Sequence, residues 1–170
     1  MNQATMKKSS AVQLEAPRLE NGKALLIAGL REHYTSETMK NIPGLWQRFG
    51  PHIGNIPGQV GRVTYGACFN ALSRDGIDYL AGVEVSSSSG LPRELSVATI
   101  PAQKYAVFSH REHVSKLYET VDAVHKWLPE SGLEVVCGAA DAPDFFERYS
   151  EEFDPRTGMG GVEVWVPIKS

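Results

Sequence analysis

Hydrophobic and polar positions alternate near the C-terminus of the chain, between Gly161 and Ile168. The intervening side chains of this stretch are those of Glu163 and Trp165. A period of two is typical of a β-strand. Val162, Val164, Val166 and Ile168 therefore lie on one face, and Glu163 and Trp165 lie on the other. Because the valine face is the one that packs on helices, we expect Glu163 and Trp165 to face solvent, a subunit interface or a cleft.

Similar patterns predict further strands and two helices. The strands are expected at Lys23–Leu30, Arg62–Asn70, Ile77–Val85, Leu95–Ser109 and Phe145–Glu151. One helix is expected to begin near Glu37, with an apolar stripe that includes Trp46. A second helix follows from Val114, because apolar residues recur every three or four positions until Pro129 and Gly132 end it.

The chain also repeats itself at a spacing of about 80 residues. The tetrapeptide Gly82–Val85 recurs as Gly161–Val164, 79 residues later, and Arg31–His33 recurs as Arg111–His113, 80 residues later. Trp46 and Trp127 are 81 residues apart, each in a predicted helix. Repetition at one spacing indicates a duplicated structural unit.

The order of the predicted elements gives an α+β fold made of two βαββ halves, about 14–86 and 93–169. Short hairpins imply antiparallel sheets with helices on one side. If the halves meet about a pseudo-twofold axis, Glu84 and Glu163 are equivalent and border a central ligand cleft. Residues 1–13 are expected to form a disordered tail, and 14–170 a single domain.

Composition narrows the function classes. A net charge of −3 and a pI near 6.0 provide no basic surface for a phosphate backbone, so direct nucleic acid binding is not expected. The chain lacks both the roughly 20-residue apolar run of a membrane span and the apolar core of a signal peptide, which predicts a soluble cytoplasmic protein. Cys68 and Cys137 lie in apolar stretches and are expected to be buried, reduced thiols.

Six stretches, in order between about residues 14 and 169, resemble the GyrI-like family, also called the AraC-type effector-binding or bacterial multidrug-effector domain. These stretches are 45–49, 65–69, 104–110, 127–132, 143–149 and 162–167. The resemblance implies a pseudo-twofold fold whose cleft binds lipophilic, often cationic, drug-like compounds through aromatic side chains and buried glutamates. Here those glutamates are Glu163 first, then Glu147 and Glu84. Family members are usually fused to a DNA-binding helix-turn-helix module, and this chain is expected to be a stand-alone member.

A carboxylate beside aromatic rings suits an organic cation, because ring faces attract positive charge and ring surfaces bury the apolar body of the ligand. We expect a partly protonated Glu163 that ionises when a cation arrives, so that binding weakens in acid. The alternative is an ordinary edge-strand charge, and Glu84 has an equal claim to a solvated or packing role. The other candidate ligand-binding residues, each open to a core or surface role, are Trp165, Glu147, Tyr149, Trp46, Phe69 and Tyr65.

Three functions remain open from the sequence. The first is a non-enzymatic sensor or sequestration protein, with a role in transcription regulation. The second, implied by the resemblance, is a hydrolase of reactive cyclopropane-bearing compounds with Glu163 as general base. The third is an interaction module for gyrase, a DNA-binding regulator or the transcription machinery, as a monomer or a homodimer. No cofactor is expected, and the five histidines do not show the spacing of a metal site.

Overall fold

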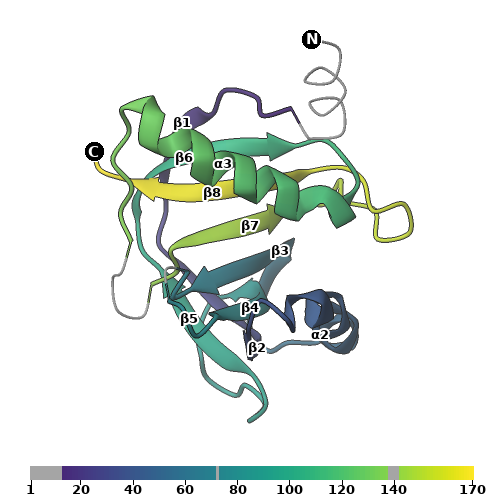
Figure 1. Cartoon of the computed structure of the whole chain (residues 1–170). Coiled ribbons are helices and arrows are strands. Elements are labelled where there is room, and N and C mark those ends of the chain that lie inside the picture. The colour runs from purple at the N-terminus through teal and green to yellow at the C-terminus, as the bar shows by residue number, and fades with distance from the viewer. Residues whose placement is uncertain (1–12, 72, 138–141) are drawn as a thin grey trace.

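The computed structural model describes residues 13–71, 73–137 and 142–170, so all but the last residue of the predicted tail lies outside it. The described chain forms eight strands in one sheet and two α-helices on one side of it (Figure 1). The strands are β1 Arg18–Gly22, β2 Leu25–Tyr34, β3 Gln59–Phe69, β4 Ile77–Val85, β5 Ser96–Ile100, β6 Gln103–His110, β7 Phe145–Tyr149 and β8 Val162–Ile168. The helices are α2 Ile42–Phe49 and α3 Leu117–Ser131.

The strand order β1-β6-β8-β7-β3-β4-β2-β5 is symmetric about the β7–β3 pair. Each half places its strands in the same order outward from this centre, and all pairings are antiparallel. The α+β fold with two βαββ halves is therefore confirmed. The edge strands are exchanged: β1 pairs with β6 of the second half, and β5 pairs with β2 of the first.

The prediction of one strand from Leu95 to Ser109 was wrong. The segment forms β5 and β6, which separate at Pro101 and Ala102 and run to different parts of the sheet. Proline lacks a backbone N–H and favours such a break. Because only two residues join strands near opposite edges of the sheet, the sheet must curl.

The helices lie on the same face of the sheet, with α3 near β6 and α2 near β2 and β4 (Figure 1). Helix α2 is shorter than predicted, because its first residues form a separate 3-10 turn at Met39–Asn41 and Pro43 occupies its first turn. Helix α3 continues past Pro129 and ends at Gly132, whose φ of 83° closes the helix in the left-handed conformation. The central strands β7 and β3 are left between the two helices.

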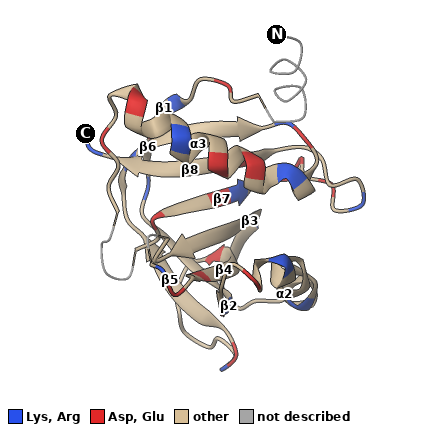
Figure 2. Cartoon of the chain, in the orientation of Figure 1, with Lys and Arg blue, Asp and Glu red and all other residues tan. Residues whose placement is uncertain are grey.

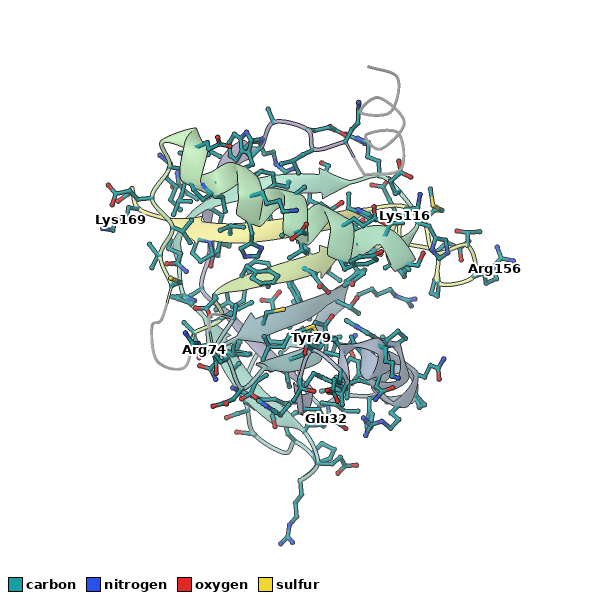
Figure 3. The ribbon with its side chains drawn as sticks, viewed as in Figure 1. Glu32, Arg74, Tyr79, Lys116, Arg156 and Lys169 are labelled. Atoms are coloured by element: carbon teal, nitrogen blue, oxygen red, sulfur yellow. The ribbon has the colours of Figure 1, made fainter. Side chains whose placement is uncertain are left out.

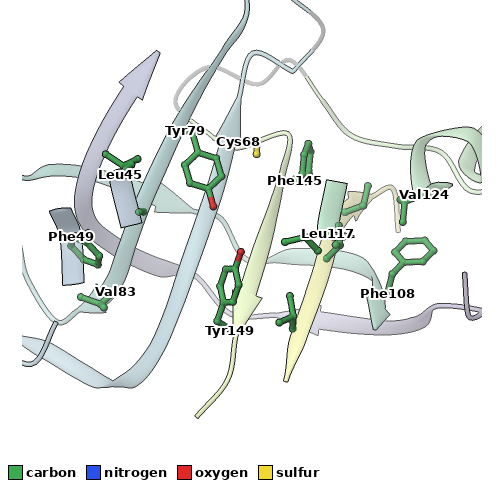
Figure 4. Packing of buried hydrophobic residues seen from close by; sticks show 14 of the residues in the cluster. Leu45, Phe49, Cys68, Tyr79, Val83, Phe108, Leu117, Val124, Phe145 and Tyr149 are labelled. Atoms are coloured by element: carbon green, nitrogen blue, oxygen red, sulfur yellow. The ribbon is translucent and has the colours of Figure 1, made fainter. Parts of the chain in front are cut away.

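Two apolar clusters pack on the two faces of the sheet. The cluster beneath the helices includes Leu45, Phe49 and Val124, together with the valines of β8 (Figure 4). The cluster on the opposite face includes Tyr65 and Tyr105. Both faces of the sheet are therefore core surfaces, whereas the sequence predicted a cleft on the face that the helices leave open.

The described surface mixes charges of both signs, as on α3, where acidic and basic residues are interspersed (Figure 2). Among the described residues, no helix has the length and apolarity that crossing a membrane requires. Both cysteines are free, and Cys68 is buried as predicted. Cys137 is exposed, so the prediction that it is buried was wrong. It does not lie in a strand, since the nearby β-bridge is formed by Val135 with Ile168.

Candidate functional site

Glu147 is a buried carboxylate at the centre of the sheet, with 8% of its surface exposed. It lies on β7, and the period of two places it with Phe145 and Tyr149 on the face that carries the helices. Its Oε1 atom accepts hydrogen bonds from the hydroxyls of Tyr79, at 2.6 Å, and Tyr149, at 2.8 Å. The two phenols point toward one another from β4 and β7 (Figure 4).

Trp46 adds a third aromatic ring from α2. Its Nε1–H donates to the Tyr79 hydroxyl at 3.0 Å, and its ring meets Tyr149 edge to face at 5.2 Å between centroids. A chain of hydrogen bonds thus runs from a half-buried helix residue to the buried carboxylate. We call Trp46, Tyr79, Glu147 and Tyr149 the Glu147 cluster. Tyr79 lies near the middle of the molecule, whereas Lys169 and Arg156 lie at its margins (Figure 3).

The electrostatics of this cluster follow from its burial. Burial raises the pKa of Glu147, and the two phenol hydrogen bonds only partly oppose that shift. Burial and the Glu147 charge together raise the pKa of Tyr79 and of Tyr149, so both remain hydrogen-bond donors. Both phenol hydrogen bonds end on Oε1 of Glu147, and no ion pair to this carboxylate occurs within the described ranges. The cluster therefore presents a carboxylate without a counter-ion.

Glu163, unlike Glu147, has arginine partners. It lies on the opposite face of the sheet, 2.8 Å from Arg18 Nη1 and 3.8 Å from Arg148 Nη1, and it accepts a hydrogen bond from Trp165 Nε1 at 3.0 Å. Burial disfavours its charged form, but the hydrogen bonds from Arg18 and Trp165, together with the charges of Arg18 and Arg148, outweigh burial and lower the pKa of Glu163. The prediction of a partly protonated Glu163 was wrong, because two guanidinium groups already neutralise this carboxylate.

The remaining candidates divide between the two faces. Trp165 stacks on Phe146, with 5.5 Å between the ring centroids. Both rings belong to the cluster on the face opposite the helices, which also buries Tyr65 and Phe69. Strand alternation places Glu84 on this same face. Only Glu147, Tyr149 and Trp46 meet on the helix face. The eight predicted residues therefore do not border one cleft, since strand alternation sends Glu84 and Glu163 to the face opposite Glu147.

Tyr79 is the site residue that sequence reasoning missed. Its strand position matches those of Ala81 and Val83, so periodicity alone assigns it to the core, where its ring does pack. Its chemical role depends on Glu147, 68 residues away. Only the order of the strands, in which β3 lies between β4 and β7, reveals that contact.

The histidines give no metal centre within the described ranges, where no group of three or more potential ligand side chains occurs. Buried His110 uses both ring nitrogens, one with the Thr120 hydroxyl at 2.6 Å and one with the His113 carbonyl at 2.9 Å. Because a carbonyl only accepts, Nε2 of His110 donates.

Comparison with known proteins gives concordant matches. Transcriptional regulator BrlR of Pseudomonas aeruginosa is 31% identical over 153 residues, which cover 89% of this chain and 54% of that protein. The chain thus spans about half the length of this curated relative.

Among solved structures, SAV2435 bound to tetraphenylphosphonium superposes with a TM-score of 0.70 at 22% identity, covering 94% of this chain and 95% of that chain. The EcmrR C-terminal domain superposes with a TM-score of 0.66 at 13% identity, covering 94% and 99%. These two matches establish the fold.

The GyrI-like small molecule binding domain matches residues 15–169, nearly the whole chain. The resemblance carried by the six sequence stretches is thereby confirmed. The chain is a small-molecule binding domain related to transcription regulators, and it belongs to the GyrI-like family.

Proposed function

We propose that this protein binds lipophilic organic cations at the Glu147 cluster. The proposal rests on one observation. The buried carboxylate of Glu147 has aromatic neighbours, and no described residue forms an ion pair with it. A buried charge without a partner is costly. A bound cation removes that cost by supplying the counter-charge that Glu147 lacks in the ligand-free protein. This gain favours binding.

The surrounding rings favour the same class of ligand. Trp46, Tyr79 and Tyr149 can each contribute about 0.5 to 2 kcal/mol through a cation–π contact, more when water is excluded. Their apolar surfaces bury the hydrocarbon part of the ligand. Neither force is strongly directional, which favours a broad range of lipophilic cations over one precisely shaped compound.

The relatives support a regulatory use of such binding. SAV2435 has been solved with tetraphenylphosphonium, a lipophilic cation, and BrlR is a transcriptional regulator. We propose that this chain likewise senses such compounds and passes the signal to a DNA-binding regulator or the transcription machinery. Trp46 is suited to this task, because it connects the carboxylate to the surface helix α2.

Calorimetric titration with tetraphenylphosphonium tests the proposal. Glu147→Gln keeps the size of the side chain and removes its charge, so we expect affinity to fall tenfold or more. Glu163→Gln is the matched control on the opposite face and should change affinity less than about twofold. Equal losses in the two variants would refute the assignment to Glu147.

The pH dependence supplies a second test, since the charge of tetraphenylphosphonium does not titrate. Burial raises the pKa of Glu147, so the carboxylate becomes neutral at a higher pH than an exposed glutamate does. Affinity is expected to decrease as the pH falls through that raised pKa, and the Glu147→Gln variant is expected to show no such decrease. A flat wild-type profile would contradict the proposed role of the carboxylate.

A further inference from the structure

Gly66 occupies the symmetry position opposite Glu147. The pairing of β3 with β7 runs from Thr64 with Tyr149 to Cys68 with Phe145, and Gly66 with Glu147 is its central pair. The two residues are 81 positions apart, the same separation as Trp46 and Trp127. Gly66 and Glu147 are therefore equivalent positions of the two halves, facing one another across the pseudo-twofold axis.

Tyr79 reaches Glu147 only by crossing β3. It lies on β4, Glu147 lies on β7, and β3 separates the two strands. Two strand spacings amount to about 10 Å, so the phenol has to lie over the backbone of β3 to bring its hydroxyl within 2.6 Å of the carboxylate. The residue beneath it on β3 determines whether this path is open.

Gly66 is that residue. A Cβ atom at position 66 would be 2.1 Å from the Tyr79 hydroxyl oxygen and 2.5 Å from Oε1 of Glu147. Both distances are far shorter than any van der Waals contact allows. The backbone of Gly66 is not in the left-handed region, so space rather than backbone conformation explains the glycine.

We propose that Gly66 is a positioning residue of the site, whose missing side chain lets Tyr79 cross β3 and donate its hydroxyl hydrogen to Glu147. The use of this contact in ligand capture rests on the proposed function, but the contact itself does not. By keeping the donor in place, Gly66 makes the ionised form of Glu147 less costly. It is also the reason that the duplicated site carries one carboxylate at its axis and not two.

The experiment measures Glu147 in the ligand-free protein, by following its side-chain carboxyl carbon in an NMR pH titration. Gly66→Ala should displace the phenol, and the midpoint of the Glu147 titration should then move to higher pH. Gly50→Ala is the matched control, because Gly50 has a helical φ of −46° and open space around it. An unchanged midpoint in Gly66→Ala would overturn the proposal, since a purely structural glycine would affect stability alone.

A second variant covers the case in which Gly66→Ala does not fold. Tyr79→Leu removes the ring that the added methyl group would meet, so Gly66→Ala should cost markedly less stability in that background. Thermal unfolding of the two single variants and the double variant measures this coupling. If the double variant is no better folded than Gly66→Ala alone, Gly66 does not act through Tyr79.

Titration with tetraphenylphosphonium then separates the two proposals. We expect Gly66→Ala to bind about tenfold more weakly than wild type at neutral pH, because the higher titration midpoint leaves more of Glu147 in its neutral form. Failure of the wild-type protein to bind the cation would refute the proposed function. It would leave the NMR and unfolding results to decide the role of Gly66.

Discussion

Glu147 and Glu163 carry the same functional group in opposite electrostatic surroundings. Two arginines and an indole hold Glu163 in its ionised form, whereas Glu147 has phenol donors and burial. The first arrangement is complete in itself. The second gains from a ligand that carries positive charge, which is why the proposed site lies at Glu147.

This contrast predicts opposite effects of the same substitution on stability. The folded-state pKa of Glu147 is raised, so its ionisation opposes folding once the pH rises above its ordinary unfolded value. Glu147→Gln should therefore raise the stability of the ligand-free protein at neutral pH, by about 1 kcal/mol. Urea unfolding measures the change.

Glu163→Gln provides the comparison. The folded-state pKa of Glu163 is lowered, so its ionised form stabilises the fold above the unfolded pKa, and that contribution is lost as the pH falls through the folded value. The variant should be less stable than wild type at neutral pH. A loss of stability in Glu147→Gln as large as that in Glu163→Gln would contradict the assigned difference.

At the scale of elements, His33 fastens the end of β2 to the turn between β3 and β4. Its Nδ1 lies 2.8 Å from Asp78 Oδ1 and its Nε2 lies 2.6 Å from the Asp75 carbonyl oxygen. Both partners only accept hydrogen bonds, so the ring donates from both nitrogens as an imidazolium. The hydrogen bonds to Asp78 and Asp75 raise the pKa of His33. The hydrogen bond from His33 lowers the pKa of Asp78, although burial acts in the opposite direction.

The pH range of this contact follows from those two directions. The His33 contribution is complete below its unfolded pKa, about 6.5, and is lost as the pH rises through its folded pKa. The Asp78 contribution is complete above its unfolded pKa, about 3.9, and is lost as the pH falls through its folded pKa. His33→Gln should therefore destabilise the protein more at about pH 5.5 than at about pH 8.5. Equal destabilisation at both values would show that His33 acts as a neutral ring.

Elements with strong periodicity could be predicted from the sequence, and weakly patterned ones could not. Strand β4 was predicted with its observed bounds, because its apolar positions alternate between two turns. Strand β1 was missed, since its single large apolar residue, Leu19, is half exposed at the sheet edge. The break between β5 and β6 depends on where each strand finds a partner, which is a property of the assembled sheet.

For the candidate site, the sequence identified the residue types but not their grouping. The repeat matched Glu84 with Glu163, but the strand pairings do not make them equivalent. Glu163 lies opposite Arg148 on β7, whereas the β4 residue opposite Ala67, the counterpart of Arg148, is Leu80. The axis of the repeat instead passes between Gly66 and Glu147, two residues that are not alike. A symmetric search therefore overlooks a site in which one half supplies the charge and the other supplies the space.

At the scale of the whole molecule, the exchange of edge strands predicts that neither half is independent. In the first half β2 needs β5 as its outer neighbour, and β1 pairs only with β6 of the second half. Separate fragments 14–86 and 93–169 should each be unfolded by circular dichroism, because each exposes unpaired strand edges and an uncovered apolar face. Mixed together, they should refold into one complex. A folded spectrum from either fragment alone would contradict this prediction.

The Glu147 cluster is itself divided between these fragments, since Trp46 and Tyr79 come from the first and Glu147 and Tyr149 from the second. A cation bound as proposed would contact both pieces at once, and neither piece alone would bind it. In a split form of the protein the compound would therefore act as molecular glue, and its dose would set the fraction of fragments that are joined. In the proposed function, the junction between the two halves is itself the receptor.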